Sequence, residues 1–128
     1  LTTLKAANFF LAAISTRESR TLHISLEHAG IRHFFDCIIS GDEVTHVKPH
    51  PEPVLKALAY FSLSPQQVFM VGDTSVDIDA GKNAGVETVG VTYGIHGEKI
   101  KESNPDYSID DIAELLTIPL VNSYTLPT

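Results

Sequence analysis

An apolar run that ends in Gly-Asp, with a second aspartate four residues later, constrains this chain more than any other feature of its sequence. The run Val68–Val71 precedes residues 72–77, which read Gly-Asp-Thr-Ser-Val-Asp. A short apolar run before a glycine turn predicts a buried strand, and the apolar spacing up to Gly85 predicts a short helix. Asp73 then lies at the carboxyl end of the strand, and Asp77 lies in the first turn of the helix. Residues four apart share a helix face, so we expect both carboxylates to face one crevice that suits a divalent cation.

The composition is that of a folded globular domain. The 128 residues are 43% hydrophobic and 20% charged, and no stretch approaches the ~20 apolar residues of a membrane span. We expect a core over residues 1–117 and a tail over residues 118–128, because the tail has two prolines and no periodicity. The net charge of −7 argues against nucleic acid and anionic membranes as partners. Cys37 is the single cysteine and cannot form an internal disulfide, which fits a reducing compartment, so we expect a cytoplasmic location.

Strand patterns alternate with helix patterns along the chain. The predicted strands are 9–14, 37–40, 67–71, 86–91 and a short one near Tyr107. The predicted helices are the end of one at 4–7, one from Thr16 or Ser19 to Ala29, one from Pro51, and those at 75–84 and 110–116. For the second and third of these, the expected buried residues are Leu22, Leu26 and Ala29, and Val54, Leu55, Leu58 and Ala59. This alternation predicts an α/β fold, a three-layer Rossmann-like parallel sheet with helices on both faces.

Two further segments carry residue types that bind phosphate. Ser15 and Thr16 follow the first predicted strand, where a hydroxyl and free backbone N–H groups can hold a phosphate oxygen. Taken alone, this pair is better explained as a helix cap. Lys48 lies in a segment with prolines at 49, 51 and 53, which restrict where its ammonium can point. Its charge suits a phosphoryl group or a carboxylate, and Asp73, beside a buried strand, needs such a partner or a metal.

The histidines do not form a predicted metal site. His46 and His50 are four residues apart, but Lys48 and Pro49 between them spoil a regular helical turn. Residues 23, 28 and 33 are histidines spaced five apart, which drift around a helix. The sequence also lacks a zinc motif, a Gly-x-Ser-x-Gly elbow and a Gly-x-Gly-x-x-Gly loop after the first strand.

Taken in order, these features resemble the haloacid dehalogenase-like (HAD) hydrolase superfamily, and most closely its phosphoglycolate-phosphatase-like members. Residues 9–16 are similar to the second motif of this family, which implies that Ser15 is its phosphate-binding hydroxyl. Residues 41–43 and 48–53 resemble the third motif, with Lys48 as its lysine. Residues 72–77 resemble the fourth motif, with Asp73 as a Mg²⁺ ligand and Asp77 holding metal-bound water or Lys48. The resemblance covers residues 1–116.

One part of the family pattern is absent. The resemblance implies a first motif, Asp-x-Asp, that carries the nucleophile, followed by an inserted cap, and neither is found here. The strand of that motif belongs between the strands at 9–14 and 67–71, so its absence leaves two apolar strand edges. We therefore expect the chain to be the inactive C-terminal portion of a Mg²⁺-dependent phosphatase, which hydrolyses a small phosphorylated metabolite through an aspartyl-phosphate. If it stands alone, we expect a homodimer or a strand-swapped oligomer.

Two other functions fit parts of the pattern. A non-catalytic HAD-like module for binding or assembly fits the absent nucleophile. A phospho-accepting receiver domain with Asp73 as acceptor fits less well, because receivers place the hydroxyl and the lysine after the acceptor. The substrate stays open, since dehalogenase, phosphonatase and phosphomutase chemistries share this scaffold.

Overall fold

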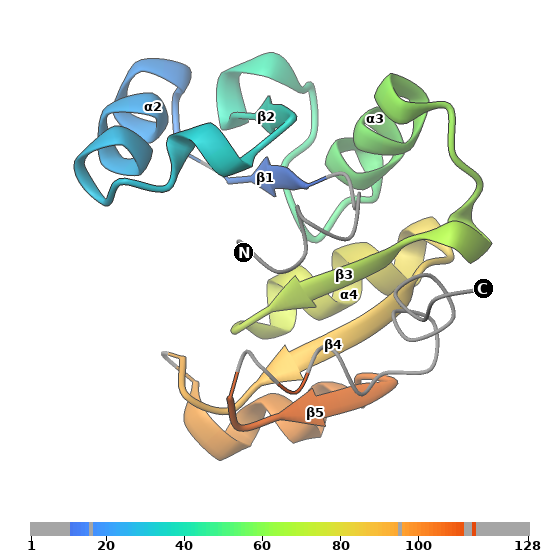
Figure 1. The fold of residues 1–128 in the computed structure, drawn as a ribbon. Helices are drawn as coiled ribbons and strands as arrows, with labels where there is room; N and C mark the ends of the chain where they lie inside the picture. Colours follow the sequence, from blue (N-terminus) through green and yellow to red (C-terminus); the bar gives the residue numbers. More distant parts are fainter. Residues whose placement is uncertain (1–10, 16, 95, 112–113, 115–128) are drawn as a thin grey trace, which may run out of the picture.

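The computed structural model describes residues 11–15, 17–94, 96–111 and 114, and it has the α/β architecture that the alternation predicts (Figure 1). The strands are β1 (Ala12–Ile14), β2 (Cys37–Ile39), β3 (Phe69–Gly72), β4 (Glu87–Val91) and β5 (Tyr107–Ile109). The α-helices are α2 (Ser19–His28), α3 (Glu52–Phe61) and α4 (Ser75–Ala84). Short 3₁₀ helices are η1 (Arg32–Phe34), η2 (Gly41–Glu43), η3 (Pro65–Gln67) and η4 (Gly97–Ser103).

The strands form two parallel sheets. One holds β1 beside β2, with Ala12 opposite Cys37, and the other has the order β3-β4-β5. Both ladders of the second sheet are parallel as well, so each sheet aligns the carboxyl ends of its strands. The division falls between β1 and β3, the position at which the resemblance places the strand of the first motif.

The two sheets share a hydrophobic core. Its buried members come from α3, from α4 and from the residue just before β4, and they are Val54, Leu58, Ala80, Ala84 and Val86. Ile14 of β1 and Met70 of β3 both pack against this cluster, so one core joins the sheets. The opposite face of β3, β4 and β5 makes a second cluster of Val89, Val91 and Ile109, with Phe69, Val71, Tyr107 and Leu11 packed against it. Burial of such side chains is the main force that holds the layers together.

The predicted element over residues 75–84 matches the structure at both ends. Thr74 is the N-cap of α4, and Gly85 ends the helix in the left-handed conformation at φ +79°. A capping box is also present at η3, between its N-cap Ser64 and its last residue Gln67, as the sequence 64–67 suggests. These ends are local, since each depends on residues within three or four positions of one another.

Several detailed expectations are wrong. Leu55 is 46% exposed and Ala59 is exposed, because α3 turns Val54 and Leu58 toward α4 instead. On α2, Leu22 is buried but Ala29 is exposed.

The start of α2 and the loop after β4 also differ from expectation. Ser19 is the first helical residue and not the cap, and its N–H donates to the Asp42 carboxylate at 2.8 Å. The helix therefore obtains its N-terminal acceptor from a distant loop. The segment expected as loop at 93–106 contains η4, whose Ile100 is fully buried. The predicted helix end at 4–7, Thr16, most of the helix at 110–116 and the tail lie outside the described residues.

Gly81 lies where α4 packs closely on the sheet. A Cβ at this position would lie 2.7 Å from Thr88 Cγ2 and 3.0 Å from Met70 Cβ. Thr88 is fully buried and its hydroxyl donates to Asp106, so its side chain has no room to withdraw.

We expect Gly81→Ala to lower the free energy of unfolding by about 1–3 kcal/mol, although alanine has the higher helix propensity by ~1 kcal/mol. Urea unfolding measures this change, and the control Asp79→Ala on the exposed face of α4 should change it by less than about 0.5 kcal/mol. A variant as stable as the original chain would contradict this close packing.

None of the helices that the structure describes has the length and apolar character that a bilayer span requires.

Candidate active site

The turn between β3 and α4 builds the centre of the site. Thr74 and Asp77 form a capping box, in which Thr74 Oγ1 accepts from the Asp77 N–H at 3.3 Å and the Thr74 N–H donates to Asp77 Oδ2 at 3.2 Å. Asp77 Oδ2 also accepts from the Thr74 hydroxyl at 3.0 Å and from the Asp73 N–H at 3.2 Å. Gly72 is required here, because a Cβ on it would overlap the Asp77 side chain. The turn therefore holds the Asp77 carboxylate in one orientation.

Lys48 forms a buried ion pair with Asp77. The Lys48 Nζ donates to Asp77 Oδ1 and to the backbone oxygen of Ile14, the latter at 3.3 Å. The two charged side chains are only 11% and 10% exposed. Burial by itself would raise the pKa of the Asp77 carboxyl, but the charge and hydrogen bond of Lys48 and the Thr74 bonds outweigh it and lower that pKa. Lys48 thus joins the carboxyl end of β1 to the first turn of α4.

The loop that carries Lys48 is held from α4 by a residue that the sequence did not point to. The Asn83 side chain donates to the Pro49 backbone oxygen at 3.0 Å. Only the folded structure indicates this role, because a lone asparagine near the end of a helix has no distinguishing pattern.

Asp73 lies at the end of β3 as predicted, and its carboxylate has different surroundings from that of Asp77. Among the residues that the structure describes, no hydrogen bond or ion pair reaches the Asp73 carboxylate. The side chain lies against Gly94, since a Cβ on Gly94 would overlap it and lie 2.8 Å from its Oδ2. Burial, followed by the charges of Asp111 and Asp73, raises the pKa of the Tyr93 hydroxyl in the same loop. The loop after β4 therefore packs against the Asp73 side chain at the sheet edge.

The donor set fits a hard divalent cation at Asp73. A carboxylate whose oxygens have no partner among the described residues is a ligand that Mg²⁺ accepts, and Gly94 packs against it without a Cβ that would overlap it. Asp77 differs, because its oxygens already accept from Lys48, Thr74 and the Asp73 N–H. Its contacts match the part of the expectation in which Asp77 holds Lys48, while its direct binding to a metal stays a prediction.

Ser15 follows β1 at the same edge. Its N–H donates to the Ile39 oxygen at 3.0 Å, which continues the β1–β2 ladder, and its Oγ accepts from the Arg17 N–H at 3.1 Å. The hydroxyl hydrogen has no acceptor among the described residues and remains able to donate. Because Lys48 reaches the Ile14 oxygen, Ser15 and the ammonium lie at the same strand end. Thr16, the other predicted phosphate ligand, lies outside the described residues.

The segment after β2 is held by polar contacts that sequence reasoning did not single out. Ser40 is fully buried, and its Oγ lies 2.6 Å from Asp42 Oδ1 and 2.8 Å from Glu43 Oε1. The hydrogen bond from Ser40 is the main reason that the pKa of Asp42 is lowered. Asp42 in turn accepts from the Ser19 N–H at the start of α2. The Gly-Asp-Glu of residues 41–43 therefore has a structural role here, in tying η2 to α2.

Comparison with known proteins gives consistent matches. Residues 1–91 match a family model described as haloacid dehalogenase-like hydrolase. Pyrophosphatase PpaX of Oceanobacillus iheyensis is 41% identical over 116 residues, which are 90% of this chain and 54% of that protein. Phosphoglycolate phosphatase of Vibrio cholerae is 42% identical over 121 residues, which are 94% of this chain and 54% of that protein.

A solved structure has the same fold. The crystal structure of a predicted phosphoglycolate phosphatase from Haemophilus somnus matches with a TM-score of 0.85 and 35% identity, over 91% of this chain and 52% of that one. The chain thus spans about half the length of the curated relatives that it matches.

Proposed function

We propose that this chain, which belongs to the haloacid dehalogenase-like hydrolase family, supplies the phosphate-binding and cation-binding residues of a Mg²⁺-dependent phosphohydrolase. The observation that carries the proposal is the Lys48–Asp77 pair, which holds a buried cationic group where β1 and α4 meet. The Asp73 carboxylate, to which no described residue is bonded, and the Ser15 hydroxyl accompany it at the ends of β3 and β1. A cation, a hydroxyl donor and a hard carboxylate are the groups that a phosphoryl oxygen and its metal require.

Each residue has a distinct proposed role. Lys48, oriented by Asp77, and Ser15 bind the phosphoryl oxygens, and Asp73 with Asp77 nearby holds Mg²⁺. The bound Mg²⁺ would neutralise negative charge on the phosphoryl group. Because Lys48 is held by its carboxylate partner before substrate arrives, little reorganisation is needed on binding.

The nucleophile is proposed to lie elsewhere. The sequence contains one Asp-x-Asp, residues 77–79, and the structure buries Asp77 against Lys48 and leaves Asp79 exposed on α4. Neither carboxylate is available to attack a phosphorus atom beside Asp73. We propose that a further strand contributes the attacking aspartate, and that hydrolysis then proceeds through an aspartyl-phosphate.

The proposed substrate is a small phosphorylated metabolite, a phosphate monoester or pyrophosphate, acted on in the cytoplasm. The names of the relatives, a pyrophosphatase and a phosphoglycolate phosphatase, support this class. The net charge of −7 is unsuited to nucleic acid or an anionic membrane.

Phosphate release from pyrophosphate and from phosphoglycolate, measured with MgCl₂ or with EDTA, tests whether the site is divided between this chain and a further strand that carries the nucleophile. We expect the purified chain to release no phosphate above the uncatalysed rate, because we propose that the nucleophile comes from a further strand. Addition of a strand that ends in Asp-x-Asp, fused ahead of residue 1, should produce Mg²⁺-dependent release. A Mg²⁺-dependent rate from the chain alone would contradict the division, and binding without turnover in the fusion would favour the non-catalytic binding module.

Binding of inorganic phosphate tests the role of Ser15 separately. A hydrogen bond to a charged group contributes about 1.5–3 kcal/mol, so Ser15→Ala should weaken phosphate binding by about 10-fold to 100-fold. Titration followed by ³¹P NMR measures this change. Ser108→Ala is the matched control, since Ser108 is exposed on β5. Equal affinity in both variants would remove Ser15 from the proposed site.

A further inference from the structure

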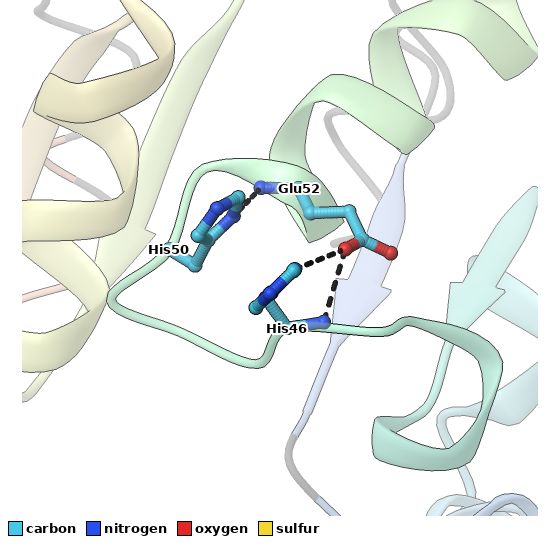
Figure 2. Close-up of side chains that lie close together, drawn as sticks. All are labelled: His46, His50 and Glu52. Atoms are coloured by element: carbon cyan, nitrogen blue, oxygen red, sulfur yellow. Dashed lines mark hydrogen bonds and ion pairs between the residues drawn. The ribbon is translucent and has the colours of Figure 1, made fainter.

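The loop that precedes α3 gathers two imidazoles and a carboxylate (Figure 2). His46, His50 and Glu52 each present a possible ligand atom, and these atoms all lie within 4.8 Å of one another. The two rings stack with their centroids 4.4 Å apart and their planes at 18°. His46 Nδ1 lies 3.2 Å from Glu52 Oε1. As the sequence predicts, no regular helical turn joins His46 to His50. The loop nevertheless brings the two rings together, because the His50 N–H donates to the Val47 oxygen and turns the chain back on itself.

The backbone fixes this cluster in place. The Glu52 carboxylate accepts from the Thr45 N–H at 2.7 Å and from the His46 N–H at 3.0 Å. The Glu52 N–H donates to His50 Nδ1 at 3.1 Å, as the upper dashed line in Figure 2 shows. Prolines at 49, 51 and 53 restrict the same segment, so its groups lose little conformational freedom when a ligand binds.

The cluster is open to solvent. The His46 side chain is 59% exposed and the Glu52 side chain is 30% exposed. An ion can therefore reach the three groups without any movement of the core. Side chains of exposed residues can also move inward by the ångström or so that coordination demands.

We propose that His46, His50 and Glu52 bind a divalent transition-metal ion, with Zn²⁺ as the best-suited species. Two imidazoles and one carboxylate form a ligand set that zinc accepts with water in the fourth position. In a tetrahedral site with bonds of about 2.0–2.2 Å, neighbouring ligand atoms lie about 3.3–3.6 Å apart. The 3.2 Å separation of His46 Nδ1 and Glu52 Oε1 is already close to that spacing.

Coordination requires a defined exchange of hydrogen bonds. The ion replaces the hydrogen bond between His46 Nδ1 and Glu52 Oε1, and the His46 ring proton moves to Nε2. His50 gives up its bond from the Glu52 N–H in either mode of binding. At Nδ1 the ion takes the lone pair that accepts this bond, and at Nε2 the ring proton moves to Nδ1, which then no longer accepts. Neutral imidazoles are required in both cases, so acid competes with the metal.

This site is distinct from the one at Asp73. Imidazole ligands favour Zn²⁺, Ni²⁺ and Cu²⁺ and not Mg²⁺, whereas Asp73 offers only carboxylate oxygens. Lys48 lies between the two histidines in the chain, but its side chain leaves the loop toward Asp77. A metal at His46 and His50 therefore bridges the residues on either side of Lys48 and stiffens the segment that carries it.

Zinc titration against a chromophoric chelator, with MgCl₂ in large excess, tests the proposal. We expect one Zn²⁺ per chain, and both His46→Asn and His50→Asn should weaken its binding about 10-fold or more. Asparagine at 46 can still donate to Glu52, so a loss of affinity in that variant reports on the ligand and not on the loop. His28→Asn, an exposed histidine of α2, and Asp73→Asn are the matched controls and should leave the affinity unchanged.

NMR of the imidazole signals gives a second readout that does not depend on activity. Addition of ZnCl₂ should shift the ring signals of His46 and His50 and leave those of His28 in place. Absence of saturable Zn²⁺ binding would overturn the proposal. Binding that persists in the His46→Asn, His50→Asn double variant, or that is lost in Asp73→Asn, would overturn it as well, since the ion would then sit at the carboxylate site.

Discussion

Replacement of Asp77 by asparagine is expected to lower the free energy of unfolding by about 3–5 kcal/mol, which is the range for removing one partner of a buried ion pair. The variant leaves the Lys48 ammonium, 11% exposed, without its counter-charge. It also weakens the acceptor at Oδ2, which receives the Thr74 hydroxyl and two backbone N–H groups. Urea unfolding of the purified chain measures the change, with an unaltered m-value as the sign that the unfolding transition is the same.

A double-mutant cycle separates the ion pair from the turn. Lys48→Met removes the charge partner but keeps the capping box, so it should cost less than Asp77→Asn. The double variant should lose less free energy of unfolding than the two single variants lose together, because no buried charge is then left unpaired. A loss below about 1 kcal/mol in Asp77→Asn would show that the pair is solvated and does not hold the site together.

The same pair predicts a dependence of stability on pH. The pKa of Asp77 is lowered in the folded chain, so its contribution is complete above the unfolded value of about 3.9 and is lost as the pH falls through the folded value. Asp77→Asn should lack this part of the acid destabilisation. The comparison is made in EDTA, so that metal binding does not enter.

Replacement of Asp73 by asparagine is expected to weaken Mg²⁺ binding and leave the stability of the fold almost unchanged, unlike replacement of Asp77. Mg²⁺ affinity should fall about 10-fold or more, because the variant loses a carboxylate that no described residue pairs. Mg²⁺-dependent hydrolysis by an active form that contains this chain should fall by about 10²–10³-fold, the typical effect of removing one electrostatic contact to a transition state. Stability without metal should change by less than about 0.5 kcal/mol, since no described residue is bonded to the Asp73 carboxylate.

Asp79→Asn is the control for Asp73→Asn. Asp79 is exposed on α4, two residues beyond Asp77. Its replacement by asparagine removes the same charge as Asp73→Asn does. It should alter neither Mg²⁺ affinity nor the rate. A destabilised Asp73→Asn with unchanged Mg²⁺ affinity would contradict the assignment, and would make Asp73 a structural residue like Asp77. Titration calorimetry and urea unfolding of the same samples provide both measurements.

Much of the site was accessible from the sequence. The apolar run and the glycine predicted that Asp73 ends a strand and Asp77 opens a helix, and the structure has α4 at Ser75–Ala84. The need of a carboxylate for a cation suggested Lys48 or a metal as the partner of Asp73, while the family resemblance also implied that Asp77 holds Lys48. The structure pairs Lys48 with Asp77, whose carboxylate the capping box orients.

The misplaced residues have a common cause. Periodicity identified which residues of α2 and α3 are apolar, but Ala29 and Leu55 are exposed because the neighbours that would cover them are set by packing. Thr16 or Ser19 was expected as a cap from its residue type, yet Ser19 is the first helical residue and its N–H donates to Asp42, 23 residues away. The His46–His50 pair was missed because the proline-rich loop between them follows no repeating pattern.

The sequence by itself determined the alternation of strands and helices and the ends of α4. Those properties depend on contacts within three or four residues, which sequence patterns encode directly. Only the tertiary structure decided that Lys48 pairs with Asp77 and not with Asp73, that the strands divide into two sheets, and that two histidines meet Glu52. Those outcomes join segments as much as 29 residues apart, and they follow from how loops and core side chains pack against one another.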